Sequence, residues 1–119
     1  LSQLSGGQRQ RVFIAMALAQ NTKILFLDEP TTYLDIRYQL DILRLVKKLN
    51  REYGITIVMV LHEINQAIHF SDEVIGLKDG KVLVQGDPKD VITTESISEL
   101  YDVHLNVADI DGQKFVLTV

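Results

Sequence analysis

Apolar and polar residues alternate along this chain in blocks that predict strands and helices in turn. Two short runs, KILFLD at 23–28 and ITIVMVL at 55–61, are almost wholly apolar, which is typical of buried parallel strands. Between them, the segment 36–53 places apolar residues at helical spacing on one face and charged residues on the other. Asp35 precedes this segment as an N-cap would, and Gly54 follows it as a helix-ending glycine would. The pattern predicts a strand–helix–strand core.

The other segments predict further helices and two β-hairpins. The expected helices span 9–20, 63–70, a short segment that begins at Asp87-Pro88, and 94–101. The expected strands span 73–77, 81–85, 104–109 and 114–119. Asp79-Gly80 and Asp111-Gly112 lie between paired strands, and such dipeptides favour hairpin turns because glycine tolerates positive φ. The predicted fold class is α/β, with a mostly parallel sheet, flanking helices and C-terminal β-hairpins, in one unit spanning 1–119.

Composition narrows the possible functions. Hydrophobic residues make up 46% and charged residues 24%, which is close to the globular average and argues against disorder. Twelve basic residues against 16 acidic ones give a formal charge of -4, so non-specific nucleic-acid binding is not expected. The sequence has no cysteine, which excludes disulfides, thiolate metal sites and a catalytic thiol. It also has neither an apolar run of about 18 residues nor a signal-peptide pattern at its start.

Two parts of the sequence contain residues suited to ligand binding or catalysis. Ser5-Gly6-Gly7 precedes the helix expected at 9–20, and backbone amides at a helix N-terminus favour an anion such as phosphate. The alternative is a glycine-rich turn before a buried helix. Asp28 and Glu29 end an apolar strand, where ligands collect in open α/β sheets, and His62 follows the next strand. The alternative there is a surface pair of acids or a helix cap.

Four elements occur in a fixed order along the chain: LSGGQ at 4–8, ILFLDE at 24–29, TYLD at 32–35 and His62. Together they resemble the signature motif, Walker B strand, D-loop and H-loop of an ATP-binding-cassette (ABC) nucleotide-binding domain. The resemblance covers nearly the whole chain and corresponds to the C-terminal half of that P-loop NTPase-type domain. The sequence around these motifs most resembles ATPases of iron-siderophore, haem and vitamin B12 importers, although Glu63 stands where Asp is expected in that subfamily.

The resemblance implies a role for each motif residue. Glu29 is expected to be the general base that polarises the attacking water, and Asp28 to hold Mg²⁺ directly or through water. His62 is expected to contact the γ-phosphate of ATP and to hold Glu29 and the water in place. Asp35 is expected both to cap a helix and to meet the partner subunit near its ATP site. The signature residues are expected to contact ATP bound to the opposite subunit: Leu4, Ser5, Gly6, Gly7 and Gln8.

The resemblance also implies partners and a location. It predicts a homodimer of ATPase subunits that works with membrane permease subunits at the cytoplasmic face of the inner membrane. Closure of the dimer around two ATP molecules would power uptake of an iron(III)-siderophore or a similar metal chelate. This inference about transport rests on the family, because no residue here selects the cargo.

A P-loop of the form G-x-x-x-x-G-K-[ST] does not occur in the 119 residues. The nearest match, GLKDGK at 76–81, has one residue too few between its glycines and fits a hairpin better. The adenine-stacking aromatic residue and the glutamine loop of the family would also lie before Leu1. Because the chain begins with Leu1 rather than Met, we expect it to be cut from a longer protein. A sheet that lacks its other strands would expose an edge and an apolar face, so self-association is expected.

Two other functions remain open at the level of sequence. The first is a DNA-repair or chromosome-maintenance ATPase of the Smc type, which salt-dependent DNA binding by the full-length protein would favour. The second is a non-catalytic interaction module derived from an ATPase half. The presence of both Glu29 and His62 argues against the second.

The isolated 119-residue chain is expected to bind MgATP very weakly and to hydrolyse none, because it lacks the loop that grips the β- and γ-phosphates. Calorimetric titration and a phosphate-release assay test this expectation. Sub-millimolar affinity, or phosphate release that Glu29→Gln abolishes, would contradict it.

Overall fold

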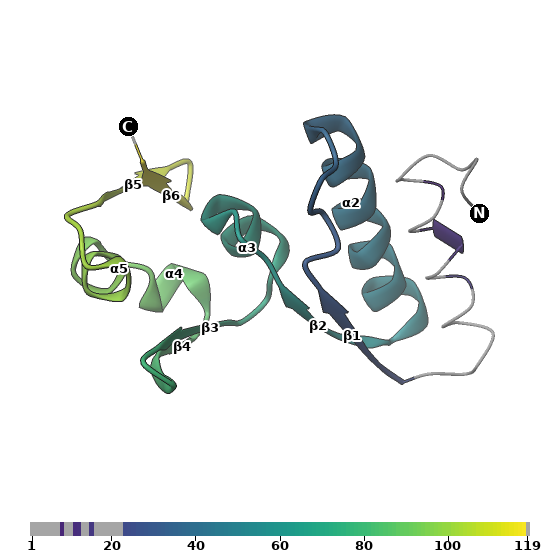
Figure 1. The fold of residues 1–119 in the computed structure, drawn as a ribbon, viewed down its shortest axis with the longest axis horizontal. Helices are drawn as coiled ribbons and strands as arrows, with labels where there is room; N and C mark the ends of the chain where they lie inside the picture. Colours follow the sequence, from purple (N-terminus) through teal and green to yellow (C-terminus); the bar gives the residue numbers. More distant parts are fainter. Residues whose placement is uncertain (1–7, 9–10, 13–14, 16–22, 119) are drawn as a thin grey trace. The chain divides into compact units, whose positions relative to one another are not determined.

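The computed structural model describes residues 8, 11, 12, 15 and 23–118, and the chain divides into two compact units (Figure 1). Unit 1 is Leu1–His62 and unit 2 is Glu63–Val119. The sequence suggested a single unit, but each of the two has a hydrophobic core of its own. Of the helix expected at 9–20, the described residues Arg11, Val12 and Ala15 are helical, and the others lie outside the described part.

Unit 1 contains the predicted strand–helix–strand arrangement. Strand β1 (Ile24–Asp28) pairs in parallel with β2 (Thr56–Val60), and helix α2 (Ile36–Tyr53) connects them. The Asp35 carboxylate accepts a hydrogen bond from the Tyr38 backbone N–H at 3.1 Å, which confirms the N-cap. Gly54 ends the helix in the left-handed region at φ 66°, where a side chain would be strained.

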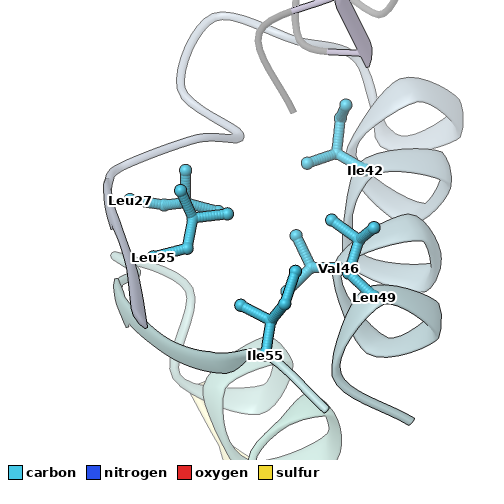
Figure 2. Close-up of a cluster of buried hydrophobic side chains, with 6 residues drawn as sticks. All are labelled: Leu25, Leu27, Ile42, Val46, Leu49 and Ile55. Atoms are coloured by element: carbon cyan, nitrogen blue, oxygen red, sulfur yellow. The ribbon is translucent and has the colours of Figure 1, made fainter. Parts of the chain in front are cut away.

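The core of unit 1 lies between β1–β2 and α2. Its members are buried aliphatic side chains that point toward one another in Figure 2: Leu25, Leu27, Ile42, Val46, Leu49 and Ile55. Burying each such side chain contributes roughly 1.5–3 kcal/mol. The sequence predicted strands buried on both faces. In the described residues only the face toward α2 is covered, and the opposite face exposes Ile24, Phe26, Val58 and Val60.

Unit 2 consists of short helices and two antiparallel hairpins. Its elements are α3 (Ile64–Phe70), β3 (Val74–Lys78), β4 (Lys81–Gly86), α4 (Pro88–Val91), α5 (Thr94–Tyr101), β5 (Asn106–Ile110) and β6 (Gln113–Leu117). Strand β3 pairs with β4, and β5 pairs with β6. Both hairpin turns lie at the Asp-Gly dipeptides that the sequence predicted. Each turn has two residues of positive φ: Asp79 and Gly80, and Asp111 and Gly112.

The C-terminal hairpin β5–β6 packs against α3 in unit 2. The Asn65 side chain donates to the Val116 carbonyl oxygen at 3.1 Å and accepts from the Val116 N–H at 2.8 Å. The His69 Nε2 lies 3.1 Å from the Lys114 carbonyl oxygen, and its ring meets the Phe115 ring edge to face at 4.5 Å. Residues 104–118 thus close this unit, and His69 holds the hairpin against α3.

No helix in the described part of the chain has both the length and the apolar character needed to cross a bilayer.

Replacing Ile42 with Ala is expected to lower the free energy of unfolding by about 2–5 kcal/mol, because it leaves a cavity at a fully buried position. The matched control is Ile36→Ala on the same helix, where the side chain is 62% exposed and the expected loss is below about 0.5 kcal/mol. Urea unfolding followed by circular dichroism measures both. Equal losses in the two variants would show that the core does not lie where Figure 2 places it.

Candidate functional site

The parallel pairing of β1 and β2 brings the two acids and the histidine together. Asp28 lies opposite Val60 in the register, so both strands end at the same edge. The Glu29 N–H donates to the Val60 carbonyl oxygen at 2.9 Å, which extends the ladder by one residue. His62 follows Val60 by two residues and reaches the same edge.

Glu29 and His62 form a direct pair at this edge. The His62 Nε2 contacts the Glu29 Oε1 as an ion pair when the imidazole is protonated, and as a hydrogen bond when it is neutral and Nε2 carries the hydrogen. The His62 side chain is 77% exposed and that of Glu29 is 36% exposed, so solvent or a ligand can reach both. An exposed pair of this kind adds at most about 1 kcal/mol to stability. The pair therefore contributes little to folding.

Glu29 adopts a backbone conformation that is unfavourable for a residue with a side chain. Its φ is 52°, in the left-handed region, which costs roughly 1–2 kcal/mol for a non-glycine residue. The chain then turns sharply, and the Thr32 N–H donates to the Glu29 carbonyl oxygen at 3.2 Å. Pro30 occupies the second position of this turn, where its fixed φ is favourable. The turn directs the chain away from the strand immediately after the acid pair.

A second turn follows and leads to α2. The Leu34 N–H donates to the Thr31 carbonyl oxygen at 3.3 Å, and Thr31 is buried. Tyr33, at the third position of this turn, has φ 66° and a fully exposed side chain. The Asp35 carboxylate caps α2 at the end of the turn. Its expected contact with a partner subunit stays a prediction.

Asp28 presents an exposed carboxylate at the end of β1. Among the described residues, no group of three or more His, Cys, Asp or Glu side chains is arranged to hold a metal ion. Carboxylate oxygen is nonetheless the donor type that Mg²⁺ prefers, and Mg²⁺ is commonly held by one or two carboxylates together with waters and substrate phosphates. Asp28 therefore offers one carboxylate of the kind that such a site uses.

The remaining predicted site residues lie mostly outside the described part of the chain. Leu4, Ser5, Gly6 and Gly7 are among the undescribed residues, and Gln8 is helical and exposed. One contact near the site involves Gln39, whose side chain donates to the Leu34 carbonyl oxygen at 2.8 Å. A polar residue in an amphipathic helix gives no sequence signal of such a bond.

The variant Glu29→Gly is expected to be more stable than Glu29→Ala by about 1 kcal/mol, because glycine removes the strain at φ 52° and both variants lack the carboxylate. The matched comparison is Asp28→Gly against Asp28→Ala at the last residue of β1, where the backbone is extended. The order should reverse there, since glycine loses more conformational freedom on folding than alanine. Chemical denaturation measures all four. The same order at both positions would contradict the left-handed conformation of Glu29.

Known proteins resemble this chain in sequence and in fold. The family model described as ABC transporter matches residues 1–32. The ferric enterobactin transport ATP-binding protein FepC of Escherichia coli strain K12 is 51% identical over 106 residues, which are 89% of this chain and 39% of that protein. The chain thus spans less than half the length of this relative.

Two solved structures share the fold. One is a chain of an ABC transporter described as of metal-chelate type and inward-facing, with a TM-score of 0.82, 30% identity, and coverage of 97% of this chain and 46% of that one. The other is the dimeric ATP-binding cassette MJ0796 bound to ADP and Pi, with a TM-score of 0.61, 49% identity, and coverage of 73% and 37% respectively. They confirm the predicted α/β fold of ABC ATPases. The chain belongs to the family of ABC transporter ATP-binding proteins.

Proposed function

We propose that this chain is the C-terminal half of the ATP-hydrolysing subunit of an ABC importer, and that Glu29 is its general base. The pairing of Glu29 with His62 beside Asp28, at the carboxyl ends of two parallel strands, carries the proposal. Glu29 and His62 are in contact there, and Asp28 is the exposed residue immediately before Glu29. An exposed ion pair stabilises the fold by at most about 1 kcal/mol. This does not exceed the roughly 1–2 kcal/mol that the left-handed conformation of Glu29 costs, so stability alone does not explain the pair.

The proposed chemistry follows from the protonation properties of each group. The Glu29 carboxylate can accept a proton from a water that attacks the γ-phosphate, and a positioned base of this kind contributes roughly 10²–10⁴-fold to the rate. His62 contacts Glu29 through Nε2 and limits the orientations that the carboxylate can take. Because the His62 ring is 77% exposed, it can also approach a phosphate oxygen.

Asp28 would hold Mg²⁺, either directly or through water. The ion would neutralise phosphate charge when it is bound. Asp28 and Glu29 are adjacent in sequence, but the regular strand ends between them, because Glu29 has a positive φ. Asp28 is the last residue of β1, whereas Glu29 begins the turn and contacts His62.

Partners and cargo are proposed from the relatives. The FepC name specifies ferric enterobactin transport, and one structural relative is described as of metal-chelate type. We infer that the full-length subunit energises uptake of an iron(III)-siderophore or a similar metal chelate, at the cytoplasmic face of the membrane and together with permease subunits. The cassette MJ0796 is dimeric, and a second copy here would meet the signature residues Leu4–Gln8 and Asp35.

The test is ATP hydrolysis by the full-length subunit. Glu29→Gln is expected to lower kcat by about 10²–10⁴-fold while ATP still binds, because the amide keeps the shape but cannot take a proton. His62→Ala is expected to lower kcat as well, because Glu29 loses its contact.

The control is Glu95→Gln, the same change at an exposed residue of α5. It should leave kcat unaltered. A Glu29→Gln subunit that hydrolyses ATP at the wild-type rate would show that Glu29 is not the base.

A further inference from the structure

We propose that Gln39 is a positioning residue for the Glu29 carboxylate, an inference that rests on the function proposed above. Gln39 lies in the first turn of α2, and its backbone N–H donates to the Asp35 carbonyl oxygen at 2.9 Å. Its side-chain Nε2 donates to the Leu34 carbonyl oxygen at 2.8 Å. Leu34 precedes the cap, so its carbonyl lies one residue outside the first backbone hydrogen bond of the helix. The Gln39 side chain thus links the turn before α2 to the helix, through a carbonyl that lies before the first backbone hydrogen bond of the helix.

From Leu34, hydrogen bonds between backbone groups lead back to Glu29. The Leu34 N–H donates to the Thr31 carbonyl oxygen at 3.3 Å. That carbonyl and the Thr32 N–H belong to the same peptide group, and the Thr32 N–H donates to the Glu29 carbonyl oxygen at 3.2 Å. Hydrogen bonds on opposite sides of one peptide group polarise and strengthen each other. The Gln39 amide is therefore connected to Glu29 through two consecutive turns.

Glu29 needs such support because its conformation is unfavourable. A non-glycine residue stays in the left-handed region only when its surroundings hold it there. The Val60 carbonyl oxygen holds the amide side of Glu29 at 2.9 Å, and the two turns hold its carbonyl side. Without the Gln39 bond the second turn would loosen, and the carboxylate would spend less time against His62.

The other end of α2 offers a matched control. The Asn50 Nδ2 donates to the Ile55 carbonyl oxygen at 2.8 Å, again five residues away along the chain and again partly buried. Both side chains are primary amides that bond a backbone carbonyl beyond the helix end. Only the Gln39 bond leads to Glu29. Loss of either bond should affect stability similarly, whereas loss of the Gln39 bond alone should affect the reaction.

The experiment compares Gln39→Met and Asn50→Leu in the full-length subunit. Methionine is unbranched and similar in length to glutamine but has no donor. For Gln39→Met we expect kcat to fall by about tenfold and KM for ATP to stay within about twofold, since a small displacement of a reacting group slows chemistry more than binding. For Asn50→Leu we expect kcat within about twofold of wild type. The thermal unfolding temperature should fall by about the same amount in Asn50→Leu and in Gln39→Met, since each variant loses one hydrogen bond to a backbone carbonyl.

Two results would overturn the inference: wild-type kcat in Gln39→Met, or an equal loss of kcat in Asn50→Leu. If Gln39→Met does not fold, Gln39→Glu keeps the shape and places a carboxylate oxygen against the Leu34 carbonyl. That variant should lose kcat to at least the same extent, and wild-type activity in it would also overturn the inference. A wild-type subunit that hydrolyses no ATP would instead refute the proposed function.

Discussion

The parallel pairing of β1 with β2 is the constraint on which the candidate site depends. The register places Asp28 opposite Val60, and this puts Glu29 and His62 at one edge. A shift of one residue would turn Leu25 and Leu27 away from α2, since side chains alternate along a strand. The core therefore fixes the register of β1 against β2, and this register determines where Glu29 and His62 lie. Packing inside unit 1 and the geometry of its polar edge are parts of one arrangement.

The core of unit 1 stabilises the fold by more than the strained backbone at Glu29 costs. A left-handed non-glycine residue costs roughly 1–2 kcal/mol. Each buried aliphatic side chain of the neighbouring core contributes roughly 1.5–3 kcal/mol, and six of them pack together between the strands and α2. The core thus outweighs the strain with a wide margin. It can hold Glu29 in a conformation that the residue would not adopt by itself.

The sequence predicted β1, α2 and β2, and it placed Glu29 and His62 at the ends of neighbouring strands, because periodicity and strand ends are local signals. It also predicted both hairpins from their Asp-Gly turns. It could not predict the φ of Glu29 or the bond from Gln39 to the Leu34 carbonyl, since both arise from tertiary hydrogen bonds that leave no periodic pattern.

The exposure of the strand face opposite α2 was missed for a related reason. An apolar run suits a strand buried on two faces, but the sequence of the strand does not say what covers each face. In the described residues nothing covers Phe26, which is 72% exposed.

Two histidines of this chain show how the surroundings of a side chain decide its use. His69 is half-buried, with Nε2 near the Lys114 carbonyl oxygen and its ring against Phe115. A carbonyl accepts a hydrogen bond but takes up no proton near neutral pH, so this imidazole can only hold the hairpin. His62 faces solvent and touches a carboxylate that can take up a proton. Of the two rings, only that of His62 has both a carboxylate neighbour and room for a ligand, and the acid–base role proposed for this edge requires both.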